Sequence, residues 1–267
     1  AQLCLACFVG AAMSRRLHAI GFLAFAGAVT GAPLQFSADI ALRIGTATAP
    51  DHSYLLDDGV NLIGFVVPAT LPVGADLDAL DIRDDDTVLF SLDQTGLVGG
   101  VYAERGDVVA CRYASCALTF DASTAGLPAG IDVDAVATRN GRLLLSFTRG
   151  VTLAPLGYVA ASDAVEFNGS SFNAVAFDGD ANGVPRNADL DALHVLGNGH
   201  LLLSFDRTLV LGGITAFDHD VIEFDPINPQ FSLLRALGSG NPAWWPADLD
   251  AISGAAVADR LFRDGFE

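Results

Sequence analysis

The chain has 267 residues, and 51% of them are hydrophobic, which is enough for one large folded domain with a substantial core. Its 32 acidic and 14 basic residues give a formal net charge of −18, which repels nucleic-acid phosphates and argues against a nucleic-acid partner. Every basic residue is arginine. The absence of lysine excludes Schiff-base catalysis and a phosphate-binding loop of the Gly-Lys-Ser/Thr kind.

Residues 1–28 have the pattern of an export signal with a short upstream extension. Met13 is the expected true start, and Arg15 and Arg16 precede an apolar run that ends in small residues, with cleavage expected after Ala28. The run is too short to span a bilayer, although an uncleaved anchor is the alternative. We therefore expect a secreted, periplasmic or cell-surface bacterial protein with no stable membrane span in its mature part.

Export changes the interpretation of the cysteines. Cys4 and Cys7 precede Met13, so the mature protein is expected to keep only Cys111 and Cys116. A pair separated by four residues suits facing positions of a hairpin, and an oxidising compartment favours its closure as a disulfide. A redox-active pair is the alternative.

An acidic couplet recurs four times after the signal. The first aspartates of the couplets stand 56, 57 and 59 residues apart, a regularity typical of structural repeats. The couplets read "ADLDAL" at 75–80, "GIDVDAV" at 130–136, "ADLDAL" at 188–193 and "ADLDAI" at 247–252.

In chain order, each complete unit predicts four short antiparallel strands. The couplet opens the first strand, and Asn140-Gly141 and Asn198-Gly199 are hairpin turns between the first and second strands. Residues 163–179 and 220–238 each supply a third and fourth strand around a polar turn. Four strands in just under sixty residues is the size of a propeller blade.

The ends of the repeat array predict a ring. Residues 33–59 align with the later part of a unit, and residues 247–254 supply a lone first strand, so the two parts would complete a fourth blade. We therefore predict an all-β, four-bladed β-propeller over residues 33–253, followed by a tail at 254–267 to which we assign no chemistry. A β-solenoid or sandwich of the same units is the alternative.

Two resemblances accompany this prediction. Each blade begins with an Asp-Ala step, and in this the chain resembles the hemopexin-like domain. The segment at 177–196, "FDGDANGVPRNADLDALHVL", resembles uncharacterised repeats of secreted bacterial proteins. They imply a four-bladed propeller and secretion, but no haem or protease role. The Asp-Ala steps are Asp78-Ala79, Asp134-Ala135, Asp191-Ala192 and Asp250-Ala251.

A ring of blades would direct the couplets towards its axis, because residues two apart on a strand face the same side. Ionised carboxylates gathered there would repel one another strongly. Either a cation such as Ca²⁺ lies among them, some stay protonated, or they turn sideways and bind backbone N–H groups of the next blade. The candidate metal ligands are Asp76, Asp132, Asp189 and Asp248.

A second candidate calcium site lies in "DGDANGVPRNAD" at 178–189. Asp178, Asp180, Asn182 and Asp189 match oxygen positions one, three, five and twelve of a calcium loop, with glycine at the bend. The flanking helices of an EF-hand are missing, so blade architecture that only resembles a metal loop is the alternative.

Histidines and serines at repeated places carry less information. His52 and His219 occupy equivalent positions in two units, where solvated loops are expected rather than shared metal ligands. Ser91, Ser146 and Ser204 sit at strand centres, outside any nucleophile-elbow context, and are expected to be structural.

Trp244 and Trp245 form an adjacent aromatic pair in a proline-bounded loop, where they could bind a sugar or a partner side chain, or fill the gap between blades. The sequence favours a secreted, non-enzymatic module that binds a protein or glycan, with Ca²⁺ as the candidate stabilising ion. The alternatives are a calcium-dependent hydrolase of the lactonase or esterase type and a structural surface protein, which self-association would distinguish.

Overall fold

The computed structural model describes residues 33–254 except 59–60, 68–70, 73 and 114. The expected signal at 1–28 and the tail from 255 onward lie outside the described residues. Within them, no helix is long and apolar enough to cross a membrane. The helices found there are short: α1 (Leu237–Gly240) and the 3-10 turns η1 (Asp180–Asn182) and η2 (Pro242–Trp244).

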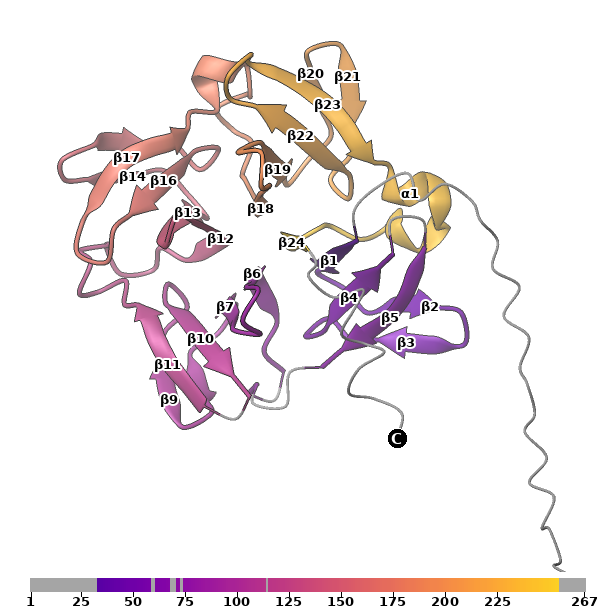
Figure 1. The fold of residues 1–267 in the computed structure, drawn as a ribbon, viewed down its shortest axis with the longest axis horizontal. Coiled ribbons are helices and arrows are strands. Elements are labelled where there is room, and N and C mark those ends of the chain that lie inside the picture. Colours follow the sequence, from indigo (N-terminus) through magenta and orange to yellow (C-terminus); the bar gives the residue numbers. More distant parts are fainter. Residues whose placement is uncertain (1–32, 59–60, 68–70, 73, 114, 255–267) are drawn as a thin grey trace, which may run out of the picture.

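Four antiparallel sheets of four strands each surround a central axis and form a four-bladed β-propeller (Figure 1). From the axis outward, the second blade contains β6 (Leu77–Ile82), β7 (Val88–Leu92), β10 (Val108–Arg112) and β11 (Ser115–Phe120). The third blade contains β12 (Val133–Arg139), β13 (Arg142–Phe147), β16 (Ala164–Phe167) and β17 (Phe172–Phe177). The fourth blade contains β18 (Ala192–Val195), β19 (Leu201–Ser204), β22 (Val221–Asp225) and β23 (Gln230–Arg235).

The remaining sheet, which we call the closing blade, joins the two ends of the described chain. Its inner strand β24 (Ala251–Gly254) pairs antiparallel with β1 (Leu34–Ser37), so that Phe36 lies opposite Ile252. The strands β4 (Tyr54–Asp57) and β5 (Leu62–Val66) complete the sheet. This pairing confirms the predicted ring, as opposed to a solenoid, because one sheet uses both ends of the repeat array.

Each blade also carries a two-stranded ribbon between its second and third strands, which the prediction of four strands did not include. Turns with left-handed glycines, such as Gly45 (φ +59°) and Gly213 (φ +89°), allow the chain to reverse so tightly. The ribbons are β2–β3 (Leu42–Ile44, Ala47–Ala49), β8–β9 (Gly96–Val98, Val101–Ala103), β14–β15 (Val151–Leu153, Gly157–Val159) and β20–β21 (Leu209–Leu211, Ile214–Ala216).

The alanine of each Asp-Ala step packs at the centre of the ring. The inner strands β6, β12, β18 and β24 contact one another around the axis (Figure 1). Their alanines are at most 1% exposed, which explains why a small residue follows each second aspartate. These alanines are Ala79, Ala135, Ala192 and Ala251.

Between the blades, apolar side chains form the core. Phe120 packs edge to face against Phe167, with ring centroids 5.0 Å apart, where the second and third blades meet. Trp244 is 1% exposed and its ring lies 6.2 Å from that of Phe36, so it fills the junction between the fourth blade and the closing blade.

The predicted disulfide is present. Cys111 on β10 stands directly opposite Cys116 on β11, and the two sulfur atoms are bonded. The Asn140-Gly141 turn also has the predicted form, because both residues have positive φ, at 52° and 76°, as a type I′ hairpin turn requires.

Candidate axial cation site

In two of the blades, a bulge positions the second aspartate of the couplet. In β6, Leu77 pairs with Leu92 and Ala79 pairs with Ser91, which leaves Asp78 as an extra residue. Asp134 holds the same place in β12. A bulge turns the extra side chain away from the regular alternation, and here it adds a second carboxyl group at the start of β6 and of β12.

The first aspartates are held by the chain around them. In three blades, the backbone N–H of the first aspartate donates to another aspartate, 2.7 or 2.8 Å away, that follows the second strand. The carboxylates of Asp76 and Asp248 each accept the N–H of the next residue at 2.8 Å. The sideways orientation therefore occurs, but the N–H groups belong to the aspartate's own strand and not to the next blade. The three donor–acceptor pairs are Asp76–Asp93, Asp189–Asp206 and Asp248–Asp39.

Three carboxylates converge between the third and fourth blades. Oxygen atoms of Asp134, Asp189 and Asp191 lie within 4.8 Å of one another, and this is the only such group of three or more acidic, histidine or cysteine side chains among the described residues. We call these three residues the axial cluster. Asp134 is only 9% exposed. Each of the three residues has one buried carboxylate oxygen that accepts no hydrogen bond while all three are ionised, whereas a protonated Asp134 would donate to Asp189.

Charge repulsion and burial act together in the axial cluster. Burial raises the pKa of Asp134, and the neighbouring carboxylate of Asp189 raises it further. Burial also raises the pKa of Asp191 well above its usual range and that of Asp189. Near neutral pH the three groups therefore do not all stay ionised by themselves. Either some of them bind protons or a cation compensates their charge.

Among the described residues, arginine supplies only part of this compensation, because Arg207 lowers the pKa of Asp189 without forming an ion pair with it. Arg105 pairs with Asp132 at 2.6 Å, and Arg207 pairs with Asp206, both beside the axial cluster. The ion pairs of the described residues include none to the three clustered carboxylates.

The axial cluster fits a hard divalent cation. Ca²⁺ takes six to eight oxygen ligands at about 2.3–2.6 Å, so two of its ligands can stand as far apart as about 5 Å. The 4.8 Å limit on the oxygens of Asp134, Asp189 and Asp191 lies within this range. Three carboxylates would supply three to six of the ligands, and water or backbone carbonyls would supply the others.

The residues of the predicted calcium loop lie in two places. Asp178 accepts the backbone N–H of Ala181 at 2.9 Å, and Asn182 donates its amide to the carbonyl of Asp178 at 2.7 Å. Asp180 forms an ion pair with Arg186 at 2.6 Å. These contacts stabilise the turn at η1, whereas Asp189, the fourth predicted ligand, belongs to the axial cluster.

The other predicted axial ligands surround the axial cluster instead of joining it. Asp76 and Asp248 accept backbone N–H groups, and Asp132 pairs with Arg105. Sequence reasoning chose the first aspartates and missed Asp134 and Asp191. The repeated Asp-Ala step was the available signal, because it places the second aspartate directly before the buried alanine.

An aromatic patch lies on the same side of the ring. Trp245 is 57% exposed and Phe217 is 39% exposed, and their ring centroids are 5.4 Å apart. Asp218, next to Phe217, is close enough to Asp248 to raise its pKa, which places the patch beside the acidic residues of the axis. Trp244 is buried, so of the two predicted tryptophans only Trp245 is accessible to a partner.

The histidines and serines have structural environments. His219 stacks on Phe217 and is 2% exposed, so the solvated loop expected there is wrong, whereas His52 is partly exposed and contacts Asp51 at 2.9 Å. The three strand-centre serines are buried and donate to backbone carbonyls, as their structural interpretation requires. They are Ser91, Ser146 and Ser204.

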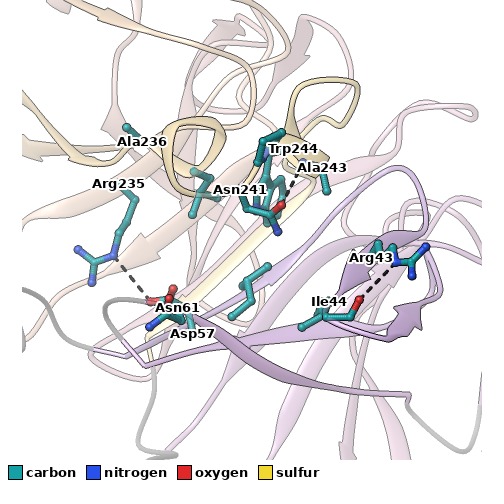
Figure 2. A pocket seen from close by; sticks show the side chains of 13 residues that line it. Arg43, Ile44, Asp57, Asn61, Arg235, Ala236, Asn241, Ala243 and Trp244 are labelled. Atoms are coloured by element: carbon teal, nitrogen blue, oxygen red, sulfur yellow. Dashed lines mark hydrogen bonds and ion pairs between the residues drawn. The ribbon is translucent and has the colours of Figure 1, made fainter. Parts of the chain in front are cut away.

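A cleft of about 540 Å³ lies where the fourth blade meets the closing blade (Figure 2). Arg235 at the end of β23 and Asp57 at the end of β4 form an ion pair across it at 3.7 Å. Arg43 lines the other side of the cleft, and Trp244 also lines it. The buried ion pair joins two blades that sequence order places far apart.

Comparison with known proteins gives no family. No family model matches the chain, and no curated protein matches it. Solved structures similar to it include the extracellular domain of a protein assigned to a one-component system of B. thetaiotaomicron, with 11% identity and a TM-score of 0.32 over 74% of this chain and 22% of that one. A Bacteroides caccae protein of unknown function has 9% identity and a TM-score of 0.32 over 77% and 74% of the two chains.

A third similar structure is PorZ, a surface component of the type-IX secretion system of Porphyromonas gingivalis. It has 15% identity and a TM-score of 0.33, covering 74% of this chain and 26% of PorZ. This chain thus spans about a fifth to a quarter of the first and third of these proteins. Likeness at this level carries no argument about function, and the propeller assignment rests on the strand pairing described above.

Proposed function

We propose that this chain is a non-enzymatic binding module whose axial cluster holds a divalent cation, with Ca²⁺ as the best fit. The observation that carries the proposal is the set of three converging carboxylates, each with a buried oxygen that accepts no hydrogen bond. Leaving such oxygens without a partner is costly, and a cation bound by all three would satisfy them together.

The partner is a protein or glycan that binds on the side of the ring containing the axial cluster. The exposed ring of Trp245 beside Phe217 offers a flat apolar surface, and the adjacent Asp218 offers a hydrogen-bond acceptor. Aromatic faces next to carboxylates suit sugar rings, whose faces carry C–H groups and whose edges carry O–H groups, and suit the arginine and aromatic side chains of proteins.

Binding is favoured over hydrolysis by the composition of the axial cluster. The group that converges there consists of three carboxylates, and no histidine of the described residues belongs to it. A metal-dependent lactonase or esterase needs a general base beside the metal-bound water, and if all three carboxylates of the axial cluster bind the cation, none of them remains free for that role. Action outside the cytosol is part of the proposal, and the bonded pair Cys111–Cys116 supports it.

Thermal unfolding with EDTA and with added Ca²⁺ tests the proposal. At a Ca²⁺ concentration 100 times its Kd, binding stabilises the folded state by about 2.7 kcal/mol, which for a domain of this size raises the midpoint by roughly 5–10 °C. Asp134→Asn should abolish this response.

A matched control separates the two predicted calcium positions. Asp178→Asn should leave the Ca²⁺ response intact, because Asp178 stabilises the turn at η1. A midpoint that ignores Ca²⁺ in the unmodified protein would refute the cation site. A response lost in Asp178→Asn and kept in Asp134→Asn would instead place the ion in the 178–189 loop.

A further inference from the structure

A second cavity lies at the other end of the propeller axis. The inner strands begin at the axial cluster, and the ends of all four border a cavity of about 650 Å³. The start of β1 also contributes to its wall. The polar side chains that line it include Asp81 from β6, Thr138 from β12, and His194 from β18, together with Arg83 just after β6.

Two polar side chains in this cavity face each other without bonding. Asp81 is 3% exposed, and its Oδ2 is buried and accepts no hydrogen bond. The Nδ1 of His194 is likewise buried without a hydrogen bond, and it stands 3.7 Å from Oδ1 of Asp81. That separation exceeds hydrogen-bond length, so both groups retain bonding capacity towards a third group.

The position of the imidazole is fixed by its neighbour. A Cβ atom added to Gly254 would lie 2.3 Å from Nε2 of His194, so only glycine leaves room for the ring at this place in β24. The close contact holds the imidazole with Nδ1 on the side of Asp81.

Charge in the cavity is predominantly negative. Arg83 donates its Nε to Thr138 at 3.1 Å, whereas Asp81, Asp84 and Asp85 also line the walls. The ligand that complements this surface is therefore a cation with several N–H donors.

We propose that this cavity binds a small molecule with a protonated primary amine. An ammonium group has three donors and no acceptor, so it can donate to Oδ2 of Asp81 and to Nδ1 of a neutral His194 at once. The carboxylate of Asp81 balances its charge. The cavity has room for a molecule the size of a monosaccharide, so amino sugars and amino alcohols belong to the ligand class.

Matched pairs of ligands test this site. Ethanolamine is compared with ethylene glycol, and glucosamine with glucose, in EDTA-containing buffer near pH ~6.5, where the amines are protonated. The readout is the imidazole C–H NMR signals of His194, identified by their loss in His194→Gln. The amines should shift these signals saturably and the neutral counterparts should not.

Variants test whether the amine contacts Asp81. Asp81→Asn should weaken amine binding at least about tenfold, since it removes the buried charge, and Asp85→Asn should leave binding within about twofold. If Asp81→Asn does not fold, the affinity of His194→Gln for the amines is measured by calorimetry instead. This variant is also expected to bind them at least about tenfold more weakly.

Equal shifts with amines and neutral counterparts, undiminished binding in the variant tested, or no saturable shift at all would overturn the proposal. The last result would mean that water alone occupies the cavity. Because the buffer contains EDTA, the outcome is independent of the cation site at the opposite end of the axis.

Discussion

Replacing Asp250 with asparagine should stabilise the cation-free protein, and by an amount that depends on pH. Burial, together with the nearby carboxylates of Asp76 and Asp39, raises the pKa of Asp250 to about 9. Between the unfolded-state pKa near 4 and the folded-state value, the native state binds more protons than the unfolded state, so stability falls as pH rises. One pKa unit corresponds to 1.36 kcal/mol, which sets an upper limit of about 4 kcal/mol lost by pH 7.

Asparagine has the size of aspartate and carries no charge, so it removes this loss. We expect Asp250→Asn to raise the free energy of unfolding by about 2 kcal/mol at pH 7, half the upper limit because solvent screens a partly buried group. At pH 4 the gain should nearly vanish. Urea unfolding in EDTA at both pH values measures the difference.

Asp121→Asn is the control of opposite sign. The N–H of Thr124 and the hydroxyls of Ser123 and Thr124 lower the pKa of Asp121, so its stabilisation exists at neutral pH and is lost as pH falls through that lowered value. An equal gain for Asp250→Asn at pH 4 and pH 7, or a loss at pH 7, would refute the electrostatic reasoning.

Three further predictions concern the junctions of the ring. Arg235→Ala should lower the free energy of unfolding by about 3 kcal/mol in urea titrations, because it leaves a buried carboxylate without its ion pair; a loss under about 0.5 kcal/mol would contradict it. Trp244→Ala should cost about 3–5 kcal/mol, and Trp245→Ala less than about 0.5 kcal/mol while weakening partner binding; equal costs would contradict the assigned burial. Replacing Cys111 and Cys116 together by serine should cost about 2 kcal/mol, with an unchanged far-UV circular dichroism spectrum; a changed spectrum would show that the disulfide determines the fold.

The fold could be predicted because the repeat spacing, the turn residues and the ends of the repeat array all indicate the same architecture. The spacing of the couplets predicted the number of blades, and the Asn140-Gly141 turn predicted a hairpin. The ring was predicted because the array begins and ends with incomplete units that complement each other, as the pairing of β1 with β24 confirms. The ribbons were missed because residues 201–211 were read as one strand, although Asp206 and Arg207 interrupt their apolar residues. The chain actually breaks at Phe205 to Thr208, between β19 and β20.

The site was harder to predict, because the couplets do not contribute alike: in the third blade only Asp134 joins the axial cluster, whereas in the fourth blade Asp189 and Asp191 both do. Simple alternation places both residues of a couplet on one side, yet Asp132 pairs with Arg105 whereas Asp134 points into the axial cluster. A bulge depends on the register between two strands, and one strand's letters do not encode register. The contact between His194 and Gly254 likewise joins strands from different blades, so local sequence gave no signal for it.

The pairing of β1 with β24 has a consequence for biogenesis. Among the described residues, the innermost strand of the closing blade is the last strand to be synthesised, so a nascent chain cannot seal the ring until Gly254 has left the ribosome. Until then, β1 exposes a sheet edge and the junction around Phe36 lacks its tryptophan. Folding of the whole ring is therefore coupled to synthesis of β24, and truncation by only a few residues of β24 should leave an aggregation-prone product.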